Sequence, residues 1–378
     1  MTRYRPTVAE IDLEAIAHNV RLLRPPGAEL MAVVKADGYG HGDAEVAKAA
    51  LEAGASRLGV SLVEEGLGLR DRGIDAPILV LTEFPPDSEK EALERGLTPT
   101  VYTDEGVAGV AEAARALGRP AGVHIKLDTG MHRVGLWPPD DAPAFARRVL
   151  DAGLELEGLW THFADSELDE AGTLEQLARF RAAAEALAAV GITPGLLHAA
   201  NSGATIRFPQ THLDLVRPGA AVYGLDPGGG LAEPFGLRPA LSWRSGVTMV
   251  KRLPTGSRLS YGGRYALERD ATIATVPVGY DDGFPRQLGG RGEVLIGGRR
   301  HPVVGTVTMD QILVDCGDDP VSAGDEVVLV GTQGDERIAI EEIAERADTI
   351  PRQIATGIGD RVPREYPAAD GRPQGRPR

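Results

Sequence analysis

The sequence predicts an α/β fold in its N-terminal part, followed by a mostly-β C-terminal domain. From about residue 10 to residue 220, apolar β-branched runs alternate with amphipathic segments, a pattern typical of parallel sheets covered by helices. After Pro239, short strand-like runs separated by glycine turns dominate. We therefore expect domains at 1–237 and 238–367. The Gly-, Pro- and Arg-rich tail at 368–378 has the composition of a disordered segment.

Eight apolar runs in the N-terminal part are expected to be strands: Met31–Val34, Arg57–Val63, Pro77–Leu81, Thr98–Tyr102, Gly122–Leu127, Leu156–Thr161, Leu196–Ala200 and Leu213–Val216. Seven amphipathic segments are expected to be helices: Asp12–Leu23, Asp43–Ala55, Glu64–Arg72, Asp87–Arg95, Asp104–Leu117, Asp141–Asp151 and Thr173–Val190. Eight strands alternating with helices is the count of a (β/α)8 TIM barrel. A doubly wound open sheet shows the same alternation, so the pattern alone leaves both folds open.

The C-terminal domain is expected to hold six main strands and one helix. The strands are Ser245–Lys251, Ala271–Val278, Glu293–Ile296, Val303–Val307, Ile312–Val314 and Glu326–Val330, and the helix is Ile340–Ala347.

Composition excludes several functional classes. The net charge of −15 leaves no uniform basic footprint for nucleic acid, and no run of 18 apolar residues is present to span a membrane. The single cysteine, Cys316, excludes an internal disulfide framework, and the histidines show no paired metal-ligand spacing. From the histidine spacing we expect no metal site. The N-terminus has no apolar signal-peptide stretch, so we expect a cytoplasmic protein.

The scarcity of lysine makes Lys35 conspicuous. Only five of the 40 basic residues are lysines, and Lys35 follows an apolar strand. In a TIM barrel that position is on the catalytic face, where desolvation lowers a lysine pKa and frees the amine for a Schiff base. A lysine that simply extends from the barrel mouth into solvent is the alternative interpretation.

The segment Val34–Gly42, Val-Lys-Ala-Asp-Gly-Tyr-Gly-His-Gly, resembles the segment of the alanine racemases that carries the lysine bound to pyridoxal 5′-phosphate (PLP). The resemblance continues through Lys-Leu-Asp-Thr-Gly-Met-His-Arg-Val-Gly at 126–135, Thr-His-Phe-Ala at 161–164, Ala-Asn-Ser-Gly-Ala at 200–204 and Val-Arg-Pro-Gly at 216–219. In the second domain it includes Ser-Tyr-Gly at 260–262, Gly-Tyr-Asp-Asp-Gly at 279–283 and Met-Asp-Gln at 309–311. These motifs run in the family's order over nearly the whole chain.

The resemblance implies a barrel domain followed by a β domain, PLP as cofactor, and an amino acid as the small-molecule substrate. It also implies a homodimer in which the β domain of one subunit completes the active site of the other. Lys35 and Tyr261 resemble the two catalytic bases on opposite faces of the substrate α-carbon. Racemisation needs two such groups because a proton leaves one face and another arrives on the opposite face.

The remaining site residues are also assigned by resemblance. Arg217 resembles the arginine that donates a hydrogen bond to the PLP ring nitrogen and keeps it unprotonated, and His162 is expected to be hydrogen-bonded to it. Residues that resemble the phosphate-binding positions are Tyr39, Ser202, Gly219 and Ala220. Residues that resemble the substrate-binding positions are Arg133, Met309, Tyr280 and Lys126, and Lys126 resembles a lysine that some members carry in carbamylated form.

One departure from the family pattern concerns the substrate pocket. Many members read Thr-Ile-Asn-Tyr-Glu where this chain reads Thr349-Ile-Pro-Arg-Gln353, so Arg352 replaces a tyrosine that reaches the PLP phosphate. Arg352 is expected to bind that phosphate through its charge and to change the wall of the substrate pocket. From the whole series of motifs we predict an alanine racemase that supplies D-alanine for peptidoglycan. Because of Arg352, a broad-specificity racemase of the same fold is the alternative. A barrel decarboxylase, against which Arg217 argues, and a PLP-binding protein without turnover are further alternatives.

Overall fold

The computed structural model describes residues 4–367 and divides into two compact units. One unit holds residues 14–238, and the other combines the residues up to 13 with those from 239 onward. The expected tail at 368–378 lies outside the described residues. The first strand, β1 (Val8–Ile11), pairs with β11 (Leu241–Gly246) and β21 (Arg364–Glu365). A barrel domain drawn from residue 1 therefore includes a strand that belongs to the other sheet.

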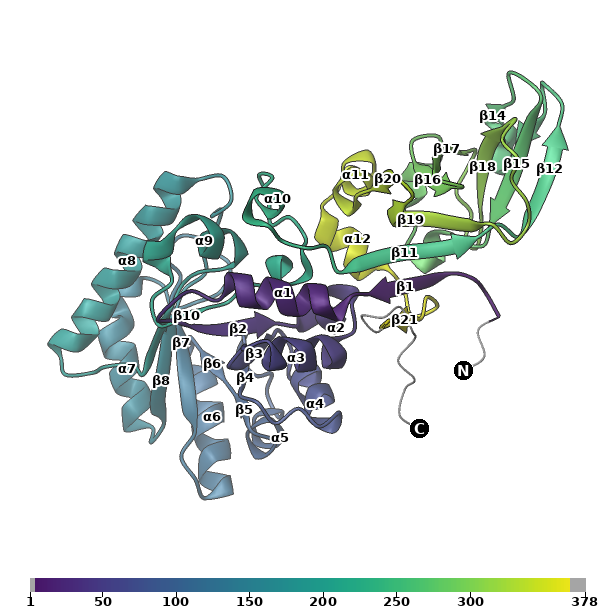
Figure 1. The fold of residues 1–378 in the computed structure, drawn as a ribbon. Helices are drawn as coiled ribbons and strands as arrows, with labels where there is room; N and C mark the ends of the chain where they lie inside the picture. Colours follow the sequence, from purple (N-terminus) through teal and green to yellow (C-terminus); the bar gives the residue numbers. More distant parts are fainter. Residues whose placement is uncertain (1–3, 368–378) are drawn as a thin grey trace. The chain divides into compact units, whose positions relative to one another are not determined.

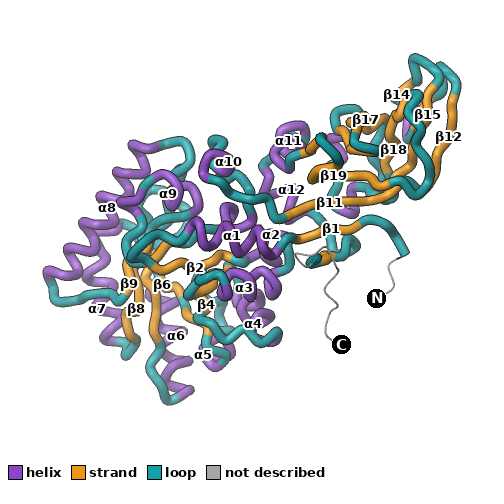
Figure 2. The backbone as a smooth tube through the Cα atoms, in the orientation of Figure 1, coloured by secondary structure: helices purple, strands orange, loops and turns teal. Residues whose placement is uncertain are grey.

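The unit at 14–238 is a barrel of parallel strands with helices outside it (Figures 1 and 2). Its strands are β2 (Glu29–Val33), β3 (Arg57–Val60), β4 (Ile78–Val80), β5 (Leu97–Thr98), β6 (Thr100–Val101), β7 (Gly122–Lys126), β8 (Glu155–Trp160), β9 (Leu196–His198) and β10 (Leu215–Val216). Pro99, which has no N–H group, separates β5 from β6, so the two count as one barrel strand.

Hydrogen bonds close this sheet into a ring. The pairing runs β10-β2-β3-β4-β5 and β6-β7-β8-β9. The backbone N–H of Asp214 donates to the carbonyl of Leu197 (3.0 Å) and that of Arg217 to the carbonyl of Ala200 (2.9 Å), so the β10 segment also joins the β9 segment. The predicted TIM barrel is confirmed, and the open doubly wound sheet is excluded.

Seven of the helical segments described in this unit correspond to the expected helices, and the short ones at 35–40, 202–207 and 232–235 were not expected. The helices are α1 (Leu13–Leu23), α2 (Lys35–Gly40), α3 (Asp43–Glu52), α4 (Val63–Asp71), α5 (Glu89–Glu94), α6 (Asp104–Leu117), α7 (Ala142–Asp151), α8 (Glu170–Ala189), α9 (Ser202–Arg207) and α10 (Ala232–Phe235). The bounds of α6 match the prediction residue for residue, because its ends are marked in the sequence. The Thr103 hydroxyl caps its first turn, and Gly118 ends it with a φ of 68°.

The second unit is mostly β, as predicted. It contains β1, β11, β12 (Met249–Leu253), β13 (Arg258–Leu259), β14 (Tyr265–Ala266), β15 (Ala271–Val276), β16 (Glu293–Ile296), β17 (Arg299–Val304), β18 (Ile312–Gly317), β19 (Glu326–Gln333), β20 (Glu336–Ile338) and β21, with α11 (Ile340–Arg346) and α12 (Pro351–Gly357). Most of these strands form one sheet in the order β12-β15-β18-β17-β16-β19-β11-β1-β21.

The expected strand Ser245–Lys251 is wrong in its bounds. The chain forms two strands there, because β11 pairs with β19 and β12 pairs with β15. Val247 and Thr248 between them donate to the carbonyls of Asp325 and Thr275.

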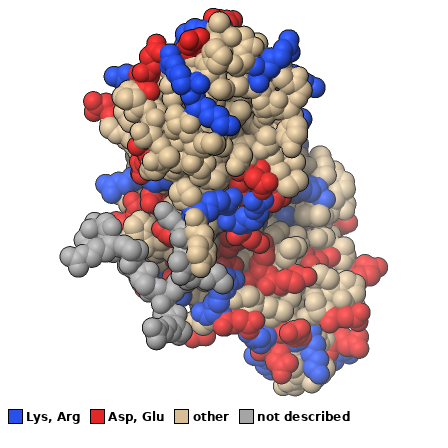
Figure 3. Space-filling model, turned by 90° about the vertical axis from the view of Figure 1, so that its right-hand side faces the viewer, with Lys and Arg blue, Asp and Glu red and all other residues tan. Residues whose placement is uncertain are grey.

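Among residues 4–367, no helix is both long and apolar enough to cross a membrane. On the face drawn in Figure 3, acidic and basic side chains are interspersed.

Candidate active site

Five of the predicted site residues lie at the carboxyl ends of barrel strands. Lys35 follows β2, Lys126 ends β7, and His162 comes two residues after β8. Ser202 begins α9 after strand β9, and Arg217 follows β10 directly. The carboxyl ends of all strands in a parallel barrel share one rim, which is where barrel enzymes place their active sites. The fold therefore gathers these side chains on a single face.

The backbone after Lys35 adopts a rare left-handed turn. Ala36, Asp37, Gly38 and Tyr39 have φ angles between 51° and 58°, and only glycine takes that conformation without steric cost. The carboxylate of Glu65 holds the turn by accepting the N–H of Ala36 at 2.6 Å. Strain of about 1–2 kcal/mol per residue is characteristic of functional sites. The turn ends the strand abruptly and leaves Lys35 at the rim.

Both rim lysines sit in surroundings that disfavour their charged form. Burial lowers the pKa of Lys35, and the positive charge of Arg133 lowers it further. Burial also lowers the pKa of Lys126 to about 7, assisted by Arg133 and Arg217. The Nζ atom of Lys126 lies 4.4 Å above the ring of Trp160. At neutral pH a substantial share of Lys126 is thus an uncharged, nucleophilic amine.

Arg217 is buried and donates three hydrogen bonds through its two Nη atoms. Its Nη1 donates to Nδ1 of His198 (2.9 Å), while Nη2 donates to the carbonyls of Thr161 (2.6 Å) and Ala199 (3.0 Å). Its guanidinium carbon lies 4.7 Å above the ring of Trp160. Burial lowers the pKa of Arg217 to about 9, so the group remains charged at neutral pH.

The sequence resemblance implies a hydrogen bond between Arg217 and His162, and this expectation is wrong. The imidazole that accepts from Arg217 is that of His198, the last residue of β9. His162 is influenced by Arg217 through charge: burial and the Arg217 guanidinium hold the pKa of His162 well below its ordinary value. His162 is therefore a neutral imidazole at the rim.

The predicted phosphate-binding residues form a compact polar cradle. The Oγ of Ser202 accepts the backbone N–H groups of Gly219 (2.9 Å) and Ala221 (3.2 Å). A Cβ on Gly219 would lie 2.4 Å from Oη of Tyr39, so glycine is required there for the tyrosine hydroxyl to approach the backbone. Ala220 begins the short helix after this approach and is buried. The hydroxyl groups of Tyr39 and Ser202, which both lie against the backbone at Gly219, are groups that can bind a phosphate.

The loop at 306–309 contacts two predicted segments of the C-terminal unit, at Tyr261 and Tyr280, and itself carries the predicted Met309. The hydroxyl of Thr306 donates to the carbonyl of Tyr261 (3.2 Å), and the N–H of Tyr280 donates to the carbonyl of Thr308 (3.0 Å). The carbonyl of Met309 accepts the next N–H, that of Asp281 (3.2 Å). Tyr261, Tyr280 and Met309 are 75%, 42% and 50% exposed. They form an outward-facing group of side chains on their own unit.

The other two predicted residues lie on separate segments. Arg133 is exposed in the loop that follows β7, where it influences the pKa values of Lys35 and Lys126. Arg352 is half-buried on α12, in the C-terminal unit.

Comparison with known proteins assigns the chain to a family. Residues 11–227 match the alanine racemase N-terminal domain, and residues 240–366 match the alanine racemase C-terminal domain. The alanine racemase of Symbiobacterium thermophilum is 49% identical over 368 residues, covering 96% of this chain and 97% of that protein. The chain belongs to the alanine racemase family.

Solved structures of the family share its fold. The alanine racemase from D-cycloserine-producing Streptomyces lavendulae superposes with a TM-score of 0.92 at 40% identity, covering 98% of each chain. A histidine racemase from Leuconostoc mesenteroides is also similar, with a TM-score of 0.89 and 30% identity over 97% of this chain and 99% of that one. Both domains and their order thus match proteins named for amino-acid racemisation.

Sequence reasoning missed three aromatic residues behind the family's rim positions. His198 accepts from Arg217 and stacks on Trp160, with ring centroids 5.7 Å apart and 7° between planes. His124 lies 2.8 Å from His198 across the barrel interior. A signal existed: His124 precedes Lys126 by two residues in one strand, so the two share a face. Only the fold shows that His198 contacts both His124 and Arg217.

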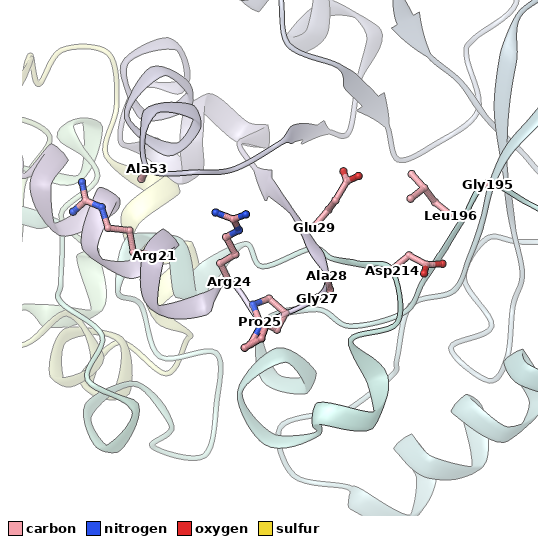
Figure 4. A pocket seen from close by; sticks show the side chains of 11 residues that line it. Arg21, Arg24, Pro25, Gly27, Ala28, Glu29, Ala53, Gly195, Leu196 and Asp214 are labelled. Carbon is pink, nitrogen blue, oxygen red and sulfur yellow. The ribbon is translucent and has the colours of Figure 1, made fainter.

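A surface pocket lies away from these residues. It is lined by α1, the loop at 24–28, and the amino ends of β2, β9 and β10, including Arg24, Glu29 and Asp214 (Figure 4). These strand ends form the rim opposite Lys35 and Arg217. The pocket therefore lies apart from the family's rim residues.

Proposed function

We propose that this chain is a PLP-dependent alanine racemase that interconverts L- and D-alanine. The observation that carries the proposal is the position of Lys35 and the buried Arg217 on the same rim of the barrel, in a chain that matches both domains of the family. We further propose that it works as a homodimer in the bacterial cytoplasm, supplying D-alanine for peptidoglycan.

The residues present fit PLP. The cradle of Tyr39, Ser202 and Gly219 offers two hydroxyl groups for the phosphate, and the missing Cβ of Gly219 lets the Tyr39 hydroxyl lie against the backbone. Lys35 offers an amine with a lowered pKa for the aldehyde. Arg217 would donate to the ring nitrogen, and because a guanidinium keeps its protons, that nitrogen would stay unprotonated.

Two groups of this chain would move the α-proton. When bound, PLP withdraws electrons from the substrate α-carbon and so acidifies its proton. The Lys35 amine is half-buried and has a lowered pKa, which suits a base on one face. We assign the other face to the phenol of Tyr261 of the second subunit. Its 75% exposure supports a role in a contact outside its own chain.

The substrate carboxylate would be bound by Arg133 and the backbone N–H of Met309. A guanidinium fork matches a planar carboxylate in charge and shape. Arg133 is exposed on a loop at the rim, and Met309 and Tyr280 belong to the outward-facing loops of the C-terminal unit. We propose that Tyr280 narrows the entrance to the pocket.

We also propose that Lys126 is carbamylated. Its uncharged Nζ would add to the carbon of CO2 and release one proton, leaving a carboxylate on the side chain. That carboxylate would replace repulsion from Arg133 with attraction. Mass measurement under CO2 and after acid treatment tests this step: a gain of one carboxyl group that acid removes is expected. A CO2-insensitive, unmodified Lys126 would contradict it.

The experiment that tests the function is α-proton exchange in D2O with chiral analysis. A panel of single L-amino acids includes alanine, serine, histidine, lysine and arginine. Inversion confined to alanine is the expected result. Inversion of several side chains would favour a broad-specificity racemase, which Arg352 and the similar histidine racemase make the second candidate. PLP binding without any exchange would contradict both assignments.

A further inference from the structure

A chain of buried polar side chains extends from Arg217 through the barrel interior. Beyond the Arg217 contact, Nε2 of His198 lies 2.8 Å from Nδ1 of His124. Both imidazoles are essentially without solvent exposure. The other nitrogen of His124, Nε2, faces Oε1 of Glu157 at 3.6 Å, close enough for electrostatic attraction but longer than a hydrogen bond.

The chain ends at charged side chains near the opposite rim. The carboxylate of Glu157 accepts a hydrogen bond from Nη1 of Arg57 at 2.7 Å. Arg57 in turn contacts the carboxylate of Glu29 at 3.1 Å. Glu157 and Arg57 also line a surface pocket, so this end of the chain reaches solvent. The Arg217 end lies at the rim that holds the candidate site.

Only one arrangement of protons satisfies every contact in this chain. Arg217 can only donate, so Nδ1 of His198 must accept, and the ring proton of neutral His198 must be on Nε2. That proton is then donated to Nδ1 of His124. The proton of His124 must therefore be on its Nε2, pointing at the carboxylate of Glu157. Each ring fixes the tautomer of the next.

The backbone of β8 is shaped to admit this chain. In the pairing of β7 with β8, Val123 faces Leu156 but His124 faces Gly158, so Glu157 is the extra residue of a β-bulge. A Cβ on Gly158 would lie 2.3 Å from Nδ1 of His124. Bulges redirect side chains, and a glycine in a strand weakens it. Apolar residues would fill the barrel at lower cost, so this arrangement suggests a role beyond packing.

We propose that His124 and Glu157 are positioning residues that lock His198 in the orientation and tautomer that accept from Arg217. Without an acceptor for its Nε2–H, the His198 ring would gain stability by turning over, and Nδ1 would then no longer face the guanidinium. Arg217 would lose one of its three hydrogen bonds, and its guanidinium would no longer be held in a fixed orientation. The proposal rests on the proposed function, because the guanidinium acts there on the PLP ring nitrogen.

The first test reads the tautomers directly in the cofactor-free protein. The protein is labelled with ¹⁵N-histidine, and the ring signals of His124 and His198 are assigned by their loss in substituted variants. The expected result is two neutral rings, each protonated on Nε2. A His198 ring that carries its proton on Nδ1, or a cationic ring at pH 7, would overturn the proposal. This measurement depends on neither PLP nor turnover.

The second test uses a matched pair of variants. His124→Asn keeps an oxygen acceptor near the former Nδ1, whereas His124→Leu has similar size and no acceptor. We expect kcat for alanine to fall about tenfold in the Leu variant, with KM little changed. This is the effect of losing one hydrogen bond, the one that His198 donates to His124. The Asn variant should recover most of that loss, and its His198 should keep the Nε2–H tautomer. Equal losses in both variants would mean that His124 acts only by packing.

The charged end of the chain is tested by a second pair. Glu157→Gln removes the charge that faces His124, and Glu29→Gln removes the other carboxylate beside Arg57 while sparing that contact. We expect mixed His198 tautomers in the first variant and unchanged tautomers in the second. Unchanged tautomers in both would remove Glu157 from the proposal. Wild-type protein that shows the expected tautomers but neither binds PLP nor racemises alanine would contradict the proposed function alone.

Discussion

Lys126 shows how the barrel sets the chemistry of one residue. Burial of its amine, assisted by the nearby positive charges, lowers the pKa from 10.5 to about 7. Below pH 7 the folded and the unfolded chain both bind the proton, and the cost of burying the charge is fully present. Between pH 7 and 10.5 only the unfolded chain keeps it, so this cost is relieved as pH rises.

We therefore predict that Lys126→Met stabilises the cofactor-free protein more at pH 6 than at pH 9. Urea unfolding in CO2-free buffer measures the difference in free energy between variant and wild type at each pH. Lys48→Met, at an exposed lysine paired with Glu45, is the control and should show no such pH dependence. A difference that is the same at both pH values would mean that Lys126 keeps an ordinary pKa.

Arg217 gives a second prediction at the residue scale. Arg217→Lys cannot reproduce a planar fork that meets His198, Thr161 and Ala199 together. Losing two charge-assisted hydrogen bonds of about 1.5 kcal/mol each corresponds to about a 100-fold fall in kcat. Steady-state racemisation measures it, with Arg148→Lys at a solvent-exposed ion pair as the control. Near-wild-type turnover in Arg217→Lys would show that charge alone suffices.

At the scale of elements, tight backbone contacts hold the loops that carry the exposed tyrosines. Gly283, which ends the turn at 280–282, has a φ of 100°, and a Cβ there would lie 2.2 Å from the carbonyl oxygen of Gly357. Gly256 also has a positive φ, of 81°, but a Cβ on it would meet nothing within 4 Å. The two glycines separate the cost of conformation from the cost of collision.

We predict that Gly256→Ala costs about 1 kcal/mol of stability, the strain of a left-handed alanine. Gly283→Ala should cost about 3 kcal/mol because collision with the backbone at Gly357 adds to the same strain. Chemical unfolding of the two variants against wild type measures both values. Equal costs would mean that the chain at 357 moves aside freely.

Local signals predicted the barrel elements well. Apolar runs marked the strands, and Thr103 and Gly118 marked both ends of α6. The sequence could not show that β1 joins the C-terminal sheet, because that pairing with β11 links residues more than 200 positions apart. The helix at Pro351–Gly357 was also missed, although proline at its first position is a start signal.

The candidate site divides in the same way. Lys35, Arg217 and the predicted phosphate-binding residues were singled out by motifs at strand ends, and their roles stay predictions. His124 and His198 escaped because a histidine inside an apolar strand gives no sign of its partner. Their contact depends on the bulge at Glu157 and the bare Cα of Gly158, which are properties of paired strands rather than of one segment.

At the scale of the whole molecule, the question is which chain completes each site. Lys35 belongs to the barrel unit, whereas Tyr261 is exposed on the other unit. If each site combines Lys35 of one subunit with Tyr261 of the second, lesions in the two residues should complement each other. Lys35→Ala and Tyr261→Phe would each be inactive as homodimers, because each lacks one of the two bases.

Mixed dimers of these two variants would then contain one doubly damaged site and one intact site. Random pairing makes half of the dimers mixed, so about a quarter of wild-type racemase activity should return after co-expression or joint refolding. Separately purified variants combined without subunit exchange are the control and should stay inactive. If both bases came from one chain, every site in a mixed dimer would keep one lesion. Activity would then remain absent after mixing, and the shared-site proposal would be wrong.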